Sequence, residues 1–218
     1  MKKISLLSLL FFVFNMATAQ QEISTAYATQ ATNMFAPLDK NRIPHKVLLD
    51  YGFEYTNLKA YNGTLSDSTV VDVPTLKHIY NTIFSSRVTS ATTGFINPNN
   101  FDSNWKNRTA GTITVSGLYY KYNAFINDAI NLGKVNFVNN QFQDKFVSGV
   151  WQNPYQEFQA FAMAPAITKY EGLSFKVKIP SAIFYSNYQS LVQSIQIDFG
   201  NGAGYITVPF NQNVTVNY

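Results

Sequence analysis

The hydrophobic pattern of this chain changes its period near Gly111, and this change constrains the fold more than any other feature of the sequence. Before Gly111, apolar residues recur every three to four positions, as on one face of a helix. After it they alternate with polar residues, as in half-buried strands. The sequence therefore predicts an α+β fold, with a small helical subdomain over residues 44–110 followed by a mainly antiparallel β-sandwich over residues 111–218.

Two amphipathic helices are expected in the first part. One begins near Pro44 and continues to Leu58, because Leu48, Tyr51 and Leu58 share one face. The other follows Asp72, whose carboxylate can accept hydrogen bonds from the free amides of a first helical turn. The two helices are expected to pack as a hairpin.

A short third helix is expected over residues 99–106, where Phe101 and Trp105 are four positions apart and would be buried together. Residues 20–43 are expected to form an extended lead-in. Its first part, residues 20–33, is polar and aperiodic, which predicts poor order.

Alternating rows of apolar residues define the strands expected after Gly111. They cover residues 113–115, 118–126, 135–137, 173–179 and 214–218. Two further rows, 195–199 and 206–210, flank the turn at Gly200, Asn201 and Gly202, and Asn-Gly favours a tight type I′ turn. The sequence thus predicts a hairpin over residues 192–210.

The first nineteen residues have the order of a secretory signal peptide. Lys2 and Lys3 precede an apolar run over residues 4–14, and the small residues Ala17 and Ala19 follow. The run is shorter than the roughly 20 residues that span a bilayer, so no transmembrane helix is expected in the mature chain. The protein is expected to be exported to the cell surface or medium, with the periplasm as an alternative.

Composition argues against several classes of partner and site. Removal of the signal peptide leaves 14 basic residues against 12 acidic ones, and after Lys3 no two basic residues are adjacent. Nucleic acid is therefore not an expected partner, because phosphate binding needs clustered Lys and Arg. The chain has no cysteine, so neither disulfides nor thiolate metal sites can form.

The run over residues 195–205 resembles the Asp-Phe-Gly-Asp-Gly hairpin of PKD-like immunoglobulin-type modules, with Asp198, Phe199 and Gly200 matched and Asn201 in place of the second Asp. Residues 35–51 resemble uncharacterised secreted proteins of Bacteroidetes-type bacteria. These resemblances imply an exported protein with an immunoglobulin-type module, and they imply no reaction.

An aromatic platform for a sugar ring is the first candidate site. Trp151 and Tyr155 would stack on the ring, while the amides of Asn153 and Gln156 would bond its hydroxyls. The alternative is that the same aromatic residues pack in the core.

A calcium ion held by Asp198 and Asn201 is the second candidate. In the alternative interpretation, these side chains bond to their own backbone beside a glycine turn. No other metal or cofactor is expected.

No catalytic residue is assigned. The two histidines, His45 and His78, lie near the starts of the expected helices without a serine elbow or a His-x-x-x-His pair. Asp50 and Glu54 could form a carboxylate pair for glycoside hydrolysis, but Lys46 precedes Asp50 by four positions and favours an ion-paired helix face.

The sequence favours a secreted or surface-displayed, non-catalytic protein with an adhesion, ligand-binding or spacer role and a glycan or protein partner. One alternative is the N-terminal accessory region of a longer secreted hydrolase whose catalytic domain follows Tyr218. Another is a small hydrolase with a cleft between the helical part and the sandwich.

Overall fold

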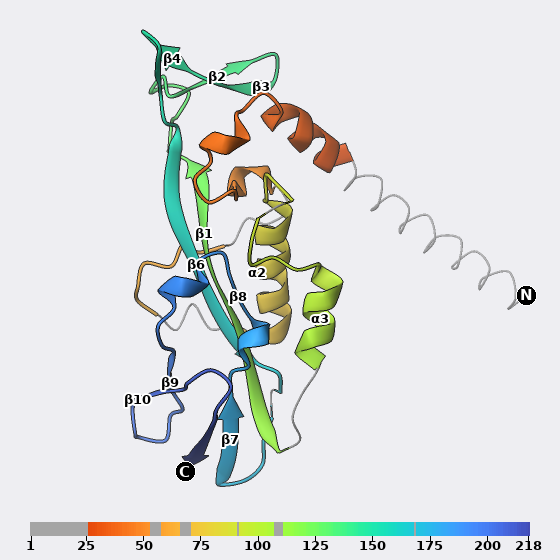
Figure 1. The fold of residues 1–218 in the computed structure, drawn as a ribbon, viewed down its shortest axis with the longest axis vertical. Coiled ribbons are helices and arrows are strands. Elements are labelled where there is room, and N and C mark those ends of the chain that lie inside the picture. The colour runs from red at the N-terminus through yellow and green to blue at the C-terminus, as the bar shows by residue number, and fades with distance from the viewer. Residues whose placement is uncertain (1–25, 53–57, 66–70, 91, 107–110, 168) are drawn as a thin grey trace, which may run out of the picture. The chain divides into compact units, whose positions relative to one another are not determined.

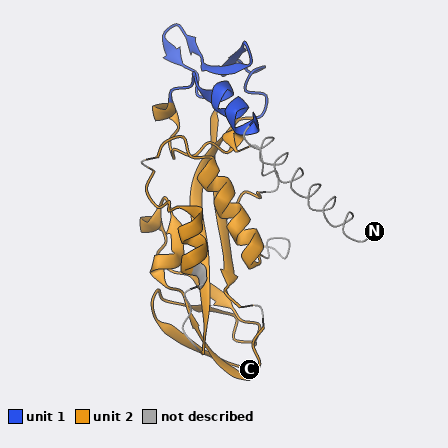
Figure 2. Ribbon diagram, turned by 90° about the vertical axis from the view of Figure 1, so that its right-hand side faces the viewer, with its two compact units in different colours: residues 1–39, 127–154 blue, residues 40–126, 155–218 orange. Residues whose placement is uncertain are grey.

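The computed structural model describes residues 26–52, 58–65, 71–90, 92–106, 111–167 and 169–218. Two compact units make up the chain (Figure 2). Unit 1 contains the residues up to 39 together with 127–154, and unit 2 contains residues 40–126 and 155–218. Each unit thus takes residues from both sides of Gly111, and the boundaries expected from the sequence, including the signal peptide, stay predictions.

Unit 2 is built around a five-stranded mixed sheet that does not close into a barrel (Figure 1). Its central strand is β1 (Thr112–Phe125), and β6 (Tyr155–Pro165) runs antiparallel along one edge of β1. The other edge of β1 pairs in parallel with β7 (Ser174–Lys178) and then with β8 (Phe184–Ser186). The last strand, β11 (Asn213–Asn217), is antiparallel to β7. The α+β class is therefore confirmed.

Helices α2 (Val73–Ser85) and α3 (Pro98–Lys106) cover one face of the β1–β6 pair (Figure 1). The carboxylate of Asp72 accepts a hydrogen bond of 2.9 Å from the Thr75 amide, as expected of an N-cap. The buried core on this face consists of Val47, Leu76, Tyr80, Ile83, Phe101, Leu118, Tyr120, Tyr122, Ala160, Ala162, Ala164, Ile183 and Tyr185. Both helices and the burial of Phe101 agree with the prediction.

A second core lies on the opposite face of the sheet, where the hairpin of β9 (Gln196–Asp198) and β10 (Tyr205–Thr207) packs against it. The buried residues of this core are Val115, Val177, Ile179, Phe184, Ile195, Val208 and Val216. The predicted hairpin is confirmed, but its turn is not the predicted two-residue type I′ turn. The connection covers residues 199–204, and φ is positive at the three glycines and not at Asn201.

β1 unites two of the expected strands. The rows over residues 113–115 and 118–126 are continuous through Gly117, where a Cβ atom would lie 2.7 Å from the Met163 side chain. The rows at 173–179 and 214–218 form β7 and β11, as predicted.

Unit 1 contains a helix over residues 26–35 and two small hairpins. β2 (Val135–Val138) pairs with β3 (Gln141–Asp144), and β4 (Phe146–Val147) pairs with β5 (Val150–Trp151). The prediction of an extended segment over residues 20–43 was wrong for residues 26–35. Ala31 and Phe35 lie one helical turn apart and are both buried, and the Phe35 ring stacks on Phe142 with centroids 5.3 Å apart.

The helix expected from Pro44 does not form over residues 44–52, which contain only the 3₁₀ turn η2 (Leu49–Tyr51). Lys46 has a φ of 56°, which is incompatible with a right-handed helix. Val47 and Leu48 then form bridges to Arg87 and Asn123 as extended residues, and both side chains are fully buried. Residues 53–57 lie outside the described part. The other 3₁₀ turns are η1 (Lys40–Arg42), η4 (Ser181–Ile183) and η5 (Gln189–Leu191).

Candidate functional site

The four residues of the expected sugar platform are divided between the two units. In unit 1, Trp151 is half-buried and its indole N–H donates a 2.9 Å hydrogen bond to Asp144, while Asn153 is exposed. In unit 2, Tyr155 is buried and its ring stacks on Phe125 with centroids 5.6 Å apart, while Gln156 is exposed. A platform that uses all four side chains stays a prediction.

The oxygens proposed for calcium bond to nearby backbone amides. Asp198 Oδ1 accepts a 2.8 Å hydrogen bond from the Gly200 amide, and Asn201 Oδ1 accepts one of 3.2 Å from the Ala203 amide. These are the local bonds that Asp and Asn make in turns. Over the described residues, no group of three or more His, Cys, Asp and Glu side chains gathers around a point. Calcium binding stays a prediction.

Of the proposed carboxylate pair Asp50 and Glu54, Glu54 lies outside the described residues. Asp50 Oδ2 accepts a 2.5 Å hydrogen bond from the Phe125 amide. Burial raises the pKa of Asp50 above its ordinary value, and the bond from Phe125 opposes this effect. His78 is exposed on α2, so it is far less enclosed than His45.

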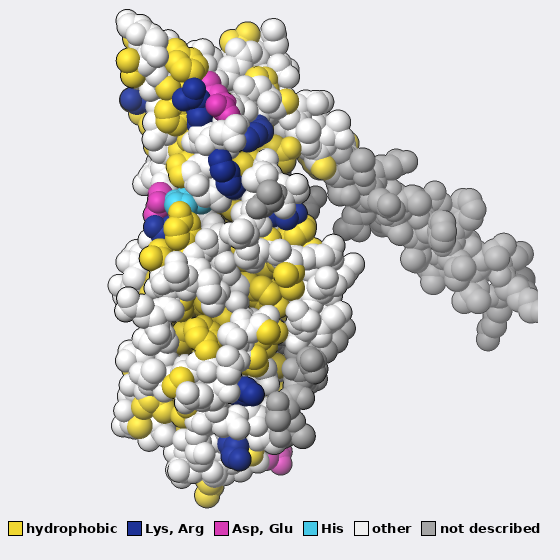
Figure 3. All heavy atoms as spheres, in the orientation of Figure 1, with side chains coloured by type: hydrophobic (Ala, Val, Ile, Leu, Met, Phe, Trp, Pro, Cys, Tyr) yellow, Lys and Arg dark blue, Asp and Glu magenta, His cyan; other side chains and the backbone are white. Residues whose placement is uncertain are grey.

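His45 belongs to a polar cluster that the sequence analysis did not find. Its Nε2 lies 2.6 Å from Oε2 of Glu157, and its Nδ1 lies 3.1 Å from the hydroxyl of Tyr188. The ammonium of Lys121 donates a 2.8 Å hydrogen bond to the other carboxylate oxygen of Glu157. Figure 3 shows a histidine beside an acidic and a basic side chain at the surface.

Electrostatics favour the charged form of the Glu157 carboxylate in this cluster. The bonds from Lys121 and His45 lower the pKa of Glu157, and the bond to Glu157 raises the pKa of Lys121. The His45 amide also donates to Asn123 Oδ1 at 3.2 Å, so both the backbone and the ring of His45 are fixed. The cluster holds the segment around His45 against β1 and β6.

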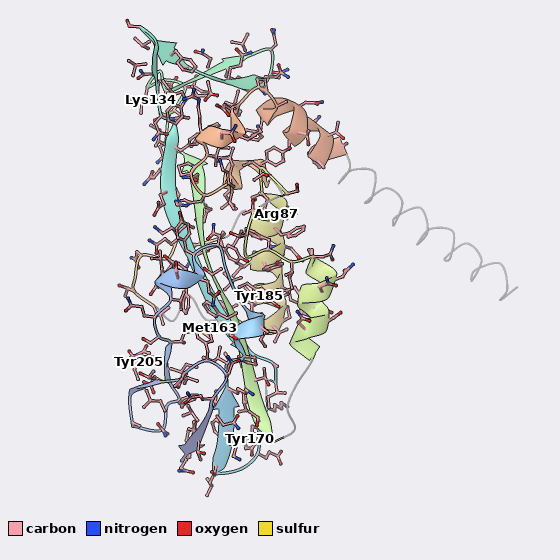
Figure 4. All side chains as sticks on the ribbon, viewed as in Figure 1. Arg87, Lys134, Met163, Tyr170, Tyr185 and Tyr205 are labelled. Atoms are coloured by element: carbon pink, nitrogen blue, oxygen red, sulfur yellow. The ribbon has the colours of Figure 1, made fainter. Side chains whose placement is uncertain are left out.

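A hollow of about 510 Å³ lies in unit 2 between the sheet and the β9–β10 hairpin. Most of its wall is apolar side chain from β1, β6 and β7. Met163 of β6 and Tyr205 of β10, both labelled in Figure 4, contribute to the wall from different elements. The remaining lining residues are Leu65, Val71, Ile113, Val115, Phe161, Ala162, Ala164, Pro165, Phe175, Val177, Gln196, Ile197, Asp198 and Phe199.

A second hollow of about 720 Å³ adjoins the first. The two share four lining residues: Leu65, Phe161, Gln196 and Tyr205. The wall of the second is more polar, because amides, hydroxyls and phenols face it. Its other lining residues are Tyr61, Gly63, Thr64, Tyr119, Gln159, Phe184, Leu191, Val192, Gln193, Ser194 and Ile195. We call the two hollows together the sheet groove.

Formal charge is scarce along the sheet groove. Among the described residues that line it, Asp198 is the only one of the types Asp, Glu, Lys, Arg and His. The hydroxyl of Tyr119 donates a 3.2 Å hydrogen bond to Gln159 Oε1, which orients both side chains. The groove can therefore bind an uncharged ligand through apolar contact at one end and neutral hydrogen bonds at the other.

The groove was not predicted because β6, which forms one of its walls, was not predicted. Residues 158–164 are mostly apolar without alternation, since Ala160, Ala162 and Ala164 face the helices while Phe161 and Met163 face the groove. A short apolar run of this kind is typical of a strand buried on both faces, so the run itself was the sequence signal from which β6 could have been predicted.

No helix in the described ranges is long and apolar enough to cross a membrane. Comparisons of the chain with protein-family models, with curated proteins and with solved structures give no match.

Proposed function

We propose that this chain is an exported ligand-binding protein whose sheet groove binds an uncharged amphiphile, a molecule with an apolar chain and a neutral, hydroxyl-rich head group. One observation carries the proposal: an apolar hollow adjoins a hollow with neutral polar walls, and the two share four lining residues. The secretory pattern at the N-terminus supports export.

The apolar hollow fits the chain of such a ligand. Ile113, Met163, Phe175 and Phe199 line it and are only partly buried, so the walls retain apolar surface that a ligand can remove from water. Burial of apolar surface contributes about 25 cal/mol per Å², and the hollow's volume lies within the usual range of about 300–1,000 Å³ for small-molecule sites.

The polar hollow fits an uncharged head. Gln193, Ser194 and Gln196 provide donors and acceptors on one wall, and the Tyr61 ring lies 5.2 Å from the Phe161 ring on another. Amides and phenols bond to hydroxyl groups without the desolvation cost of a buried charge, whereas an anionic head would find no Lys, Arg or His among the described lining residues.

The immunoglobulin-type sandwich inferred from the PKD-like run is part of this proposal. The β9–β10 hairpin packs over one face of the five-stranded sheet, which supports a two-layer arrangement of β structure around the groove.

Displacement of a fluorescent apolar probe, N-phenyl-1-naphthylamine, from the mature chain tests the proposal. We expect dodecyl glucoside, below its micelle concentration, to displace the probe more effectively than dodecanoate. Met163→Lys places a charge in the apolar wall and should weaken probe binding by about tenfold or more. Leu173→Lys is the matched control, because Leu173 is 77% exposed and does not line the groove.

Equal probe affinity for the Met163→Lys and Leu173→Lys variants would overturn the proposal. Equal displacement by dodecyl glucoside and dodecanoate would agree with binding of an alkyl chain in the apolar hollow. It would refute the assignment of an uncharged head group to the polar hollow.

A further inference from the structure

Unit 1 exposes an unusual amount of apolar surface. Of the 14 large hydrophobic residues that are exposed in the described chain, eight lie in this unit. They are Tyr27, Ile130, Leu132, Phe137, Val138, Phe146, Val147 and Val150. Exposed apolar residues are normal when scattered, but clusters of them mark interaction sites.

The β4–β5 hairpin is apolar on both of its faces. Phe146 pairs with Trp151 and Val147 pairs with Val150. Because successive residues of a strand point to opposite faces, the aromatic pair lies on one face and the valine pair on the other. Phe146 and Val147 are each 51% exposed and Val150 is 64% exposed, so solvent reaches both faces.

The tips of both hairpins are well-formed turns. Ser148 and Gly149 have φ of 50° and 79°, as in a type I′ turn, and residues 146–154 contain no charged residue. In the β2–β3 hairpin, Phe137 and Val138 are also exposed and directly precede the turn at residues 139–140. The two hairpins therefore both present apolar side chains next to tight turns.

We infer that the hairpin tips of unit 1 insert into the head-group region of a lipid bilayer. A hairpin that is apolar on both faces needs apolar surroundings on both sides, and a lipid interface supplies these without a complementary shape. A flat protein surface would cover one face and leave the other in water. Trp is enriched at the membrane–water interface, and Phe is common on the apolar face of segments that bind there.

The charges at the base of the hairpins fit lipid head groups. Lys134 directly precedes β2 and Lys145 directly precedes β4, and neither forms an ion pair with another described residue. The nearby acid Asp144 accepts hydrogen bonds from the Trp151 indole and the Asp39 amide, so its carboxylate is held by its own unit. The lysines can reach lipid phosphates while the tips lie deeper.

Flotation of the mature chain with vesicles tests the inference. Vesicles of phosphatidylcholine alone, and of phosphatidylcholine with an equal amount of phosphatidylglycerol, are the probes. We expect the chain to float with both, and more with the anionic vesicles. Val147→Ser with Val150→Ser should weaken binding by about tenfold or more. Leu173→Ser, which removes an even more exposed apolar side chain from unit 2, should leave binding unchanged.

Tryptophan fluorescence supplies a second measurement. The chain has two tryptophans, so Trp105→Phe leaves Trp151 as the only reporter. Its emission should shift to shorter wavelength with vesicles and be quenched by brominated lipid. Failure to float, or equal flotation of the double serine variant, would refute insertion. Two other outcomes would also overturn the inference. If the unaltered chain is a dimer by sedimentation and the double serine variant is a monomer, the surface contacts a second copy of the chain. If the unaltered chain binds a glycan array and the variant does not, the surface contacts a sugar. None of these outcomes affects the probe assay for the groove.

Discussion

Nε2 of His45 lies 2.6 Å from Oε2 of Glu157, a residue 112 positions away in the sequence. The His45 side chain is almost fully buried, whereas the Glu157 side chain is 45% exposed. The contact fixes the turn before η2 to β6. No local pattern in the sequence predicts that these two segments lie together.

Replacement of Glu157 by Gln tests what this contact contributes to stability. The folded pKa of Glu157 is lowered, so the carboxylate stabilises the fold above its unfolded pKa, and this stabilisation is lost as pH falls through the folded pKa. We expect Glu157→Gln to lower the free energy of unfolding by up to about 1 kcal/mol at pH 7 and by less at pH 3. Urea denaturation at both pH values measures this. Glu171→Gln, at an exposed position, is the control, and an equal loss in the two variants would contradict the prediction.

Asp50→Asn should have the opposite pH dependence. Burial raises the pKa of Asp50, so its carboxyl group is most favourable to folding when protonated, and stability decreases as pH rises through the raised folded pKa. The Asn amide oxygen can still accept from Phe125, and we expect the variant to be more stable by roughly 1 kcal/mol at neutral pH. Thermal unfolding at pH 3 and pH 7 would show a gain only at the higher pH. A variant less stable at pH 7 would mean that the bond to Phe125 outweighs desolvation.

Gly94→Ala should be among the most destabilising substitutions. Gly94 has a φ of 79°, and an added Cβ atom would collide with the carbonyl oxygen of Ser186. We expect a loss of more than about 3 kcal/mol, measured by guanidinium denaturation. Gly63→Ala separates the two causes, because Gly63 has a φ of 92° and no atom of the described residues lies within 4 Å of its Cβ position. That control should lose only about 1 kcal/mol, and similar losses in the two variants would exclude the collision as the cause.

Tyr80→Phe should remove a buried pair of hydrogen bonds. The Tyr80 hydroxyl donates to the Ile96 carbonyl at 2.7 Å and accepts from the Ile96 amide at 2.8 Å. We expect a loss of about 2 kcal/mol, because both backbone groups lose their partner. Tyr170→Phe also removes a hydrogen bond to a backbone carbonyl, at an exposed site, and should cost well under 1 kcal/mol. Urea denaturation distinguishes the two, and equal losses would contradict the role of burial.

Alkaline titration gives a further check on Tyr80. Burial raises the pKa of Tyr80 to about 12, so its neutral form stabilises the fold, and this contribution is lost as pH rises from the unfolded value near 10 towards 12. Tyr80→Phe should flatten the decline in stability over this interval.

Local signals in the sequence were sufficient for α2, α3 and the late strands. The bond between Asp72 and Thr75 spans three positions, so an N-cap can be recognised without knowledge of the fold. Apolar and polar residues alternate in β7 and β11 because one face of each strand is buried, and this alternation can be read directly in the sequence.

Long-range contacts explain why the helix expected from Pro44 does not form and why the polar cluster and the sheet groove were not predicted. Leu48 was expected on a helical face, but Val47 and Leu48 are each buried through a bridge to a distant residue, and those contacts determine the backbone there. Lys46, at positive φ, gave no warning, because its residue type does not favour that conformation. The polar cluster and the sheet groove both depend on β6, whose pairing with β1 no single segment could reveal.

The register of β1 and β6 bears on how this chain can be altered. Phe125 lies opposite Tyr155, so residues 126–154 leave and re-enter the sheet at neighbouring ladder positions. In topological terms the two long strands form one β-hairpin whose connecting loop has grown into structure of its own. The connection at this site can be exchanged if the new loop spans the short gap between the two strands and if the helix over residues 26–35, which packs on the present loop through Phe35 and Phe142, is exchanged with it. The sheet of unit 2 can thus be kept while unit 1 is exchanged as a whole.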